Sequence, residues 1–109
     1  MTVKLSKDNF EAEVLKEGIV VADFYSDSCI PCKRMSPVIA ELEEELTDVK
    51  FGKLNINFDS ETAEKYGVSS VPTLIFFRSG EEVLRLQGAQ KKITAFRSNQ
   101  QHKVRSKQK

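Results

Sequence analysis

Two cysteines, Cys29 and Cys32, stand three positions apart in the stretch SDSCIPCK, and the 109-residue chain has no others. A pair at this spacing can form a reversible disulfide, supply two ligands to zinc or close a structural disulfide. Structural zinc needs four protein ligands, and the chain adds only one histidine, His102. A fixed disulfide across so small a loop removes little entropy from the unfolded chain, and a reducing compartment opposes it. We therefore favour a redox pair.

The elements predicted around the cysteines suit redox chemistry. Residues 18–26 (GIVVADFYS) form a short apolar run typical of a strand buried on both faces. A helix is predicted from about residue 31, because Pro31 suits a first helical position. The partial positive charge and free N–H groups of a helix N-terminus stabilise a thiolate. We expect Cys29 to be the nucleophile and Cys32, one helical turn on, to attack the mixed disulfide formed on Cys29.

Two amphipathic helices flank this strand. The first is predicted over residues 6–18, about three turns long, with Ser6 as its N-cap and Gly18 as its stop. The second follows the cysteines, and Pro37 inside it should kink it. The predicted apolar stripes are Phe10, Val14 and Leu15 in the first helix and Met35, Ile39, Leu42 and Leu46 in the second. The acids of the second helix that we expect on its solvated side are Glu41, Glu43, Glu44 and Glu45.

Strands dominate the second half of the chain. Residues 49–58 and 72–77 are predicted strands, a short helical connection spans 59–67, and a turn at Gly80 leads to a last strand. The residues TVKLS offer a small opening strand. Early alternation of strands and helices predicts βαβ units, and the turn predicts an antiparallel hairpin. We therefore expect an α/β fold with a central mixed sheet, parallel and antiparallel, flanked by helices on both faces.

Charged residues are distributed unevenly along the chain. Residues 1–89 carry 10 basic and 16 acidic side chains, whereas residues 90–109 carry 7 basic and no acidic ones. Near the end an apolar stripe covers a single turn, Ile93 and Phe96, which predicts a shortened or frayed last helix. We place the domain at residues 1–97 and a flexible basic tail at 98–109. Because the tail has no interleaved aromatic residues, we expect it to be solvated and not to bind nucleic acid specifically.

The location of the protein can also be predicted from the sequence. No apolar run approaches the roughly 20 residues that span a bilayer, so we expect no membrane association. The first 13 residues, MTVKLSKDNFEAE, lack the apolar stretch of a secretory signal. We expect a cytoplasmic protein that is monomeric and uses no cofactor and no metal.

Four stretches, in order, resemble the thioredoxin family. VADFYSDSCIPCK is similar to its active-site stretch, GKLNINFD to its third strand, YGVSSVPTLIFF to its proline loop and SGEEVLRLQGA to its closing hairpin, so that about residues 3–97 are covered. The resemblance implies the thioredoxin fold and a thiol:disulfide oxidoreductase. Its partners would be disulfide-containing protein substrates and a thioredoxin reductase as electron donor. The alternatives are a binding or scaffold module with incidental redox activity and an oxidase or isomerase of the same fold.

The resemblance also implies roles for residues outside the cysteine pair. Asp23 would be the buried carboxylate that helps to deprotonate Cys32, with a pKa raised by burial, and Lys53 would lie close to Asp23 and tune it. Pro72 would follow a cis peptide bond and place the backbone of Val71 beside the cysteines, where it pairs with an extended substrate segment. The implied surface for the partner protein comprises Ile30, Pro31, Val71, Pro72, Gly88 and Ala89.

The active-site motif departs from the family's usual Trp-Cys-Gly-Pro-Cys. Here it reads Ser28-Cys29-Ile30-Pro31-Cys32, the chain has no tryptophan, and Tyr25 takes the place of a second common aromatic residue. The residues between the cysteines help to set the reduction potential. We still expect the protein to reduce the disulfides of its substrates. As a starting expectation, we take its reduction potential to be near the thioredoxin value of about −270 mV.

Overall fold

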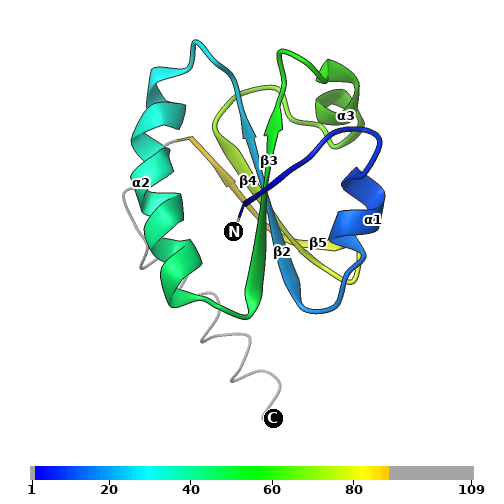
Figure 1. Ribbon diagram of the computed structural model, residues 1–109. Helices are drawn as coiled ribbons and strands as arrows, with labels where there is room; N and C mark the ends of the chain where they lie inside the picture. The colour runs from blue at the N-terminus through cyan, green and yellow to red at the C-terminus, as the bar shows by residue number, and fades with distance from the viewer. Residues whose placement is uncertain (1, 89–109) are drawn as a thin grey trace.

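Eight elements follow one another along residues 2–88, the part of the chain that the computed structural model describes (Figure 1). They are β1 (Thr2–Lys4), α1 (Phe10–Val14), β2 (Ile19–Tyr25), α2 (Ile30–Glu45), β3 (Val49–Asn55), α3 (Ser60–Lys65), β4 (Thr73–Arg78) and β5 (Glu81–Gln87). Residue 1 and residues 89–109 lie outside the described part. The predictions of a frayed last helix, a tail at 98–109 and a role for Ala89 fall there.

The five described strands form one mixed sheet in the order β1-β3-β2-β4-β5. β3 runs parallel to both β1 and β2, whereas β4 runs antiparallel to both β2 and β5. Helix α2 covers one face of the sheet, and α1 and α3 cover the other (Figure 1). The predicted mixed sheet with helices on both faces is confirmed. The central strand β2 has neighbours on both edges and helices on both faces, which explains its nearly continuous apolar sequence.

Alternate side chains of β2 enter two separate cores, because successive residues of a strand point to opposite faces. Ile19 and Val21 are buried in the core beneath α2, whereas Val20 and Phe24 are buried in the core beneath α1 and α3. The core beneath α2 includes Met35, Ile39, Leu42, Phe51, Leu74 and Phe76. The same alternation puts Asp23, the one acidic residue of β2, on the α2 face, where it is also buried.

The first helix is shorter than predicted. α1 has five residues, and the backbone N–H groups of Asn9 and Phe10 bond to the carbonyl of Ser6, so a turn precedes the helix. The hydroxyl of Ser6 accepts from the N–H of Asp8 at 3.2 Å within that turn and does not cap the helix. Leu15 follows the last helical residue and is 61% exposed, so its predicted place in the core stripe is wrong.

The second helix agrees with the prediction except at one acidic residue. α2 runs from Ile30 to Glu45 as one helix that includes Pro37; the kink predicted at Pro37 stays a prediction. Glu43 does not lie on a fully solvated face, because it is half-buried and accepts a 2.6 Å hydrogen bond from the Thr2 hydroxyl. Glu43 therefore ties α2 to the edge strand β1.

Gly52 of β3 is required by its neighbour Leu5, and its replacement should be costly. A Cβ at position 52 would lie 2.7 Å from Cγ of Leu5, whose side chain is buried. We predict that Gly52→Ala lowers the free energy of unfolding by about 1–3 kcal/mol through overpacking. Urea unfolding would measure this loss. Because truncating Leu5 removes the clash, Gly52→Ala should cost much less in a Leu5→Ala background, and an equal cost in both backgrounds would contradict the explanation.

Candidate active site

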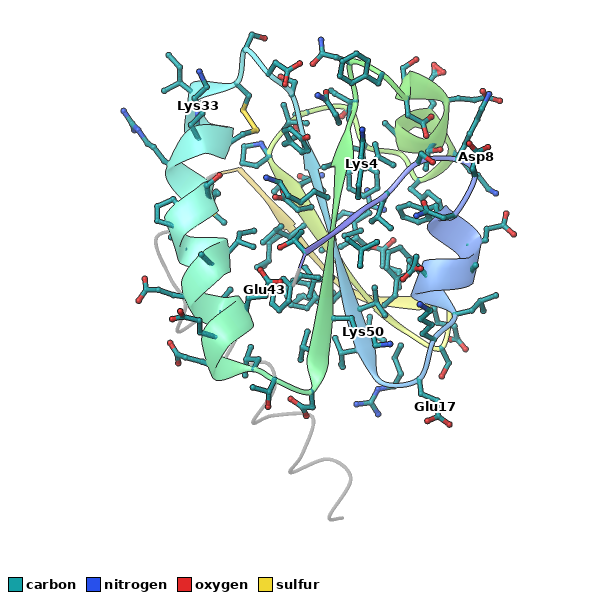
Figure 2. All side chains as sticks on the ribbon, in the orientation of Figure 1. Lys4, Asp8, Glu17, Lys33, Glu43 and Lys50 are labelled. Carbon is teal, nitrogen blue, oxygen red and sulfur yellow. A yellow bond between two sulfur atoms is a disulfide. The ribbon has the colours of Figure 1, made fainter. Side chains whose placement is uncertain are left out.

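The cysteine pair lies where strand β2 leads into helix α2. β2 ends at Tyr25, residues 26–28 form a loop, and Cys29 is the N-cap of α2. The backbone N–H of Cys32 donates to the sulfur of Cys29 at 3.1 Å. The two sulfurs are joined in a disulfide, with the Cα atoms 5.2 Å apart, and Figure 2 shows it at the start of α2 near Lys33. The sulfur of Cys29 therefore lies at the positive end of the helix dipole.

The two cysteines differ in their access to solvent. Cys29 is half-buried, whereas Cys32 is only 7% exposed. An incoming disulfide can therefore reach the sulfur of Cys29 more readily than that of Cys32. Hydrogen bonding by an N–H group and the helix dipole both stabilise a thiolate at Cys29. Access and electrostatics therefore both favour the sulfur of Cys29 for the first attack, and its role as nucleophile stays a prediction.

Asp23 is a buried carboxyl on the central strand. It is 7% exposed, and its Oδ1 has no hydrogen-bond partner among the described residues. Burial raises the pKa of Asp23 from 3.8 to about 6, because loss of water disfavours the charged form, and the positive charge of Lys53 acts in the opposite direction. The carboxyl can therefore take up and release a proton near neutral pH.

Lys53 lies beside Asp23 on the adjacent strand β3. The two residues are register partners in the parallel pair β2–β3, and the Lys53 ammonium lies 4.9 Å from the centroid of the Tyr25 ring. Together with Cys32, these three residues line a small cavity of about 140 Å³. The structure thus brings Cys32 with its buried sulfur, the carboxyl of Asp23 and the ammonium of Lys53 to one cavity.

The loop that contains Pro72 lies at the same end of the sheet as the cysteine pair. The Val71–Pro72 peptide bond is cis, and β4 starts directly after it with Thr73 paired to Phe24, close to the end of β2. Pro72 is buried, and its carbonyl accepts a 2.8 Å hydrogen bond from the N–H of Gly88. This bond brings the end of β5 to the proline loop.

The predicted partner-binding residues within the described part differ in exposure. Ile30 is 63% exposed and Pro31 is also exposed, whereas Val71 is half-buried. Gly88 is exposed and has a φ of +81°, a left-handed conformation that favours glycine. An exposed Ile30 beside the cysteines offers apolar area to a partner. The binding roles of these residues stay predictions.

Three polar residues beside the cysteines were missed by the sequence reasoning. Asn55 donates from Nδ2 to Oδ1 of Asp27 at 3.0 Å, and Asn57 accepts at Oδ1 from the N–H of Asp27 at 3.3 Å. A signal was present, because SDS directly follows β2 and the asparagines of NIN stand at and just after the end of the adjacent strand β3. Such stretches are common in loops, so the pairing itself could not be read from the sequence.

Within residues 2–88, no group of three or more His, Cys, Asp or Glu is arranged to hold a metal ion. Within the same residues, no helix has both the length and the apolar character needed to cross a bilayer.

Comparison with known proteins places the site in context. The family model described as Thioredoxin matches residues 1–99. The chain is 42% identical over 102 residues to a thioredoxin from Chlamydia caviae, covering 94% of this chain and 99% of that protein. It is 45% identical over 82 residues to a thioredoxin from Bacillus subtilis, covering 74% and 78% of the two chains.

Solved structures agree with this similarity. A thioredoxin from Plasmodium falciparum superposes with a TM-score of 0.80 at 29% identity, covering 88% of this chain and 93% of its own. A mutant thioredoxin from Halobacterium salinarum gives a TM-score of 0.77 at 33% identity, covering 83% and 80%. The arrangement of the sheet and helices described above is thus shared with thioredoxins of solved structure.

Proposed function

Since this chain belongs to the thioredoxin family and is a thiol:disulfide oxidoreductase that reduces protein disulfides, we propose that it works in the cytoplasm with electrons from a thioredoxin reductase. The redox-active group is the Cys29–Cys32 pair. The observation that carries the assignment is the sulfur of Cys29, accessible and hydrogen-bonded by the N–H of Cys32, at the N-terminus of α2. Membership of the family supports the proposed location and the proposed electron donor.

The first chemical step that we propose is attack by Cys29. In the reduced protein the thiolate of Cys29 attacks one sulfur of the substrate disulfide, the substrate S–S bond breaks, and a mixed disulfide forms. The departing substrate thiolate takes a proton from solvent. The N–H of Cys32 and the N-terminus of α2 stabilise the thiolate of Cys29, which favours this step.

The second step releases the substrate. Cys32 loses its proton, and its thiolate attacks the sulfur of Cys29, which reforms the disulfide of the enzyme and expels the second substrate thiolate. We propose that the carboxylate of Asp23 takes the proton of Cys32 through the cavity that both residues line. Overall two electrons pass from the protein dithiol to the substrate disulfide, and the thioredoxin reductase restores the dithiol.

The proposed substrate surface is the edge formed by Ile30, Pro31, Val71, Pro72 and Gly88, with Ala89 beyond the described residues. An extended segment of the substrate would pair with the backbone of Val71, and the apolar side chains of the edge would contact residues beside the substrate disulfide. Support comes from the exposed Ile30 next to the nucleophile and from the hydrogen bond that joins Gly88 to Pro72.

The reduction potential tests the direction of electron flow. We predict a value near the thioredoxin value of about −270 mV, below that of protein disulfide isomerase at about −180 mV. Equilibration with glutathione of known ratio, with thiol quantification, measures it. The oxidised protein should also accept electrons from a thioredoxin reductase and NADPH and then reduce insulin. A potential near the about −120 mV of a strong oxidant would instead favour the oxidase alternative.

A further inference from the structure

The loop that precedes the nucleophile is held by side chains at the end of the neighbouring strand β3. This cysteine loop (residues 26–28) follows β2, and both Asp27 and Ser28 in it are exposed. One backbone bond closes it, from the N–H of Cys29 to the carbonyl of Ser26 at 3.3 Å. The ladder between β2 and β3 ends at the register pair Tyr25 and Asn55, so the strands supply no further register partner here.

Asn55 and Asn57 hold this loop. Asn55 uses both ends of its amide: Nδ2 donates to Oδ1 of Asp27 at 3.0 Å, and Oδ1 accepts from the N–H of Asn57 at 2.9 Å. The side chain of Asn57 in turn accepts from the N–H of Asp27 at 3.3 Å. The N–H of Ile56 donates to the carbonyl of Tyr25 at 2.9 Å. Asp27 is thus bonded at its backbone and at its side chain.

The position of the Asp27 carboxylate matters to the chemistry. Asp27 stands two residues before Cys29 and lines the same cavity as Cys32. A carboxylate close to Cys29 would oppose the thiolate and raise its pKa. The bond from Asn55 ties this carboxylate to the last residue of β3. The other titratable groups that line this cavity are Asp23 and Tyr25 on β2, Lys33 on α2 and Lys53 on β3.

We propose that Asn55, acting through Asp27, is a positioning residue for Cys29. The pair fixes the cysteine loop, and with it Cys29 as the N-cap of α2, and it holds the carboxylate of Asp27 away from the reacting sulfur. This inference rests on the proposed role of Cys29 as nucleophile. It goes beyond that role by naming the residues that set the proportion of thiolate at Cys29 in this chain, where a serine precedes the first cysteine.

The test measures the pKa of each thiol in the reduced full-length protein. The rate of alkylation by iodoacetamide is followed against pH, and mass spectrometry identifies which cysteine is modified. Asn55→Ala should raise the pKa of Cys29 by roughly half a unit and slow its alkylation about three-fold below that pKa. Asn55→Ala/Asp27→Ala should show a smaller rise, because the freed charge is gone.

Two further variants separate positioning from general stability. Asn9→Ala is the matched control, because Asn9 also uses both ends of its amide, accepting from the N–H of Ser6 at 2.8 Å and donating to the carbonyl of Lys4 at 2.9 Å. Asn9→Ala should leave the pKa of Cys29 unchanged. Asn55→Asp should raise the pKa of Cys29, because it removes the amide that donates to Asp27. Adding Asp27→Asn should restore the wild-type pKa, because the amide donor and the carboxylate acceptor have then exchanged places.

The outcomes are distinguishable. If Asn55→Ala leaves the pKa of Cys29 at the wild-type value, as Asn9→Ala does, Asn55 is only structural and the inference is overturned. If the exchange variant Asn55→Asp/Asp27→Asn keeps the raised pKa of Asn55→Asp, the pairing with Asp27 is wrong. A wild-type protein in which Cys32 has the lower pKa would contradict the proposed function itself, independently of the variants.

Discussion

Cys29→Ser should abolish disulfide reduction, lowering the rate of insulin reduction at pH 7 by at least about 1,000-fold. The hydroxyl of serine is not ionised at this pH and does not attack a disulfide sulfur, so the first step is lost. The fold should be kept, because serine is a good N-cap and Cys29 is the N-cap of α2. Far-ultraviolet circular dichroism of the variant should therefore match that of the wild type.

The comparison variant for this result is Cys32→Ser. It should also fail to turn over, because no second thiol expels the substrate, but it should react once with a disulfide. A Cys29→Ser protein that kept more than a few per cent of wild-type turnover would show that another residue performs the attack. Equal single-turnover reactivity of the two variants would contradict the distinct roles given to the two sulfurs.

Asp23→Asn should stabilise the oxidised protein at pH 7. The pKa of Asp23 rises from 3.8 to about 6 on folding because the carboxyl is buried, so ionising it costs more in the folded protein than in the unfolded one. The difference between these pKa values corresponds to about 3 kcal/mol, an order-of-magnitude figure. Asparagine is nearly isosteric and carries no charge, so urea unfolding should show a gain of this order.

Because folding raises the pKa of Asp23, the stability gain of Asp23→Asn should depend on pH in a defined direction. The acid binds its proton more tightly when folded, so its stabilising contribution is complete below pH 3.8 and is lost as the pH rises through about 6. The stability gain of Asp23→Asn should therefore grow between these values and level off above them. A gain that is constant from pH 4 to pH 8 would contradict burial of an ionisable carboxyl at this position.

Asp59 supplies a contrasting control. It is also buried, but its carboxylate accepts from the N–H of Thr62 at 3.1 Å and from the hydroxyl of Thr62 at 2.9 Å, as the N-cap of α3. Asp59→Ala should cost about 1 kcal/mol of stability, the usual value of a cap. We expect Asp59→Ala to lower the free energy of unfolding and Asp23→Asn to raise it. This difference would show that hydrogen bonds to the carboxylate decide whether a buried aspartate stabilises the fold.

The same Asp23→Asn variant should slow the second chemical step. Without a base, deprotonation of Cys32 depends on solvent, and general bases contribute about 100-fold at the lower end of their range. Stopped-flow release of a substrate thiol from the mixed disulfide measures this. The defect should shrink as the pH approaches the ordinary thiol pKa of about 8.5, because the thiolate then forms unaided. A defect independent of pH would contradict a role in proton transfer.

Much of the fold was predictable from the sequence because its elements have strong apolar patterns. The continuous apolar run in β2 is a direct consequence of burial on two faces. The spacing of Met35, Ile39 and Leu42 in α2 is a direct consequence of burial on one. The length of α1 was not predictable, because the same residues satisfy a helical pattern and a turn closed by bonds to Ser6. Leu15 fits the stripe by spacing, yet the helix ends before it.

The candidate site was predictable only in part. The cysteine pair could be recognised from its spacing. The roles of Asp23 and Lys53 came from the family resemblance, because the sequence alone does not show which residue lies next to a single acid in an apolar strand. The register of β2 against β3 supplies that partner. The bridge from Asn55 to Asp27 joins residues 28 positions apart, and no local pattern relates them. Contacts of this kind depend on the tertiary structure.

The identity of the trapped sulfur tests the central claim most directly. Each single Cys→Ser variant is incubated with a disulfide-containing protein at pH 7, quenched with acid and mapped by mass spectrometry. We predict that Cys32→Ser accumulates a mixed disulfide at Cys29, because the accessible sulfur at the helix N-terminus attacks and nothing resolves the product. Accumulation instead at Cys32 in the Cys29→Ser protein, with little in Cys32→Ser, would contradict the assignment of nucleophile and resolving thiol.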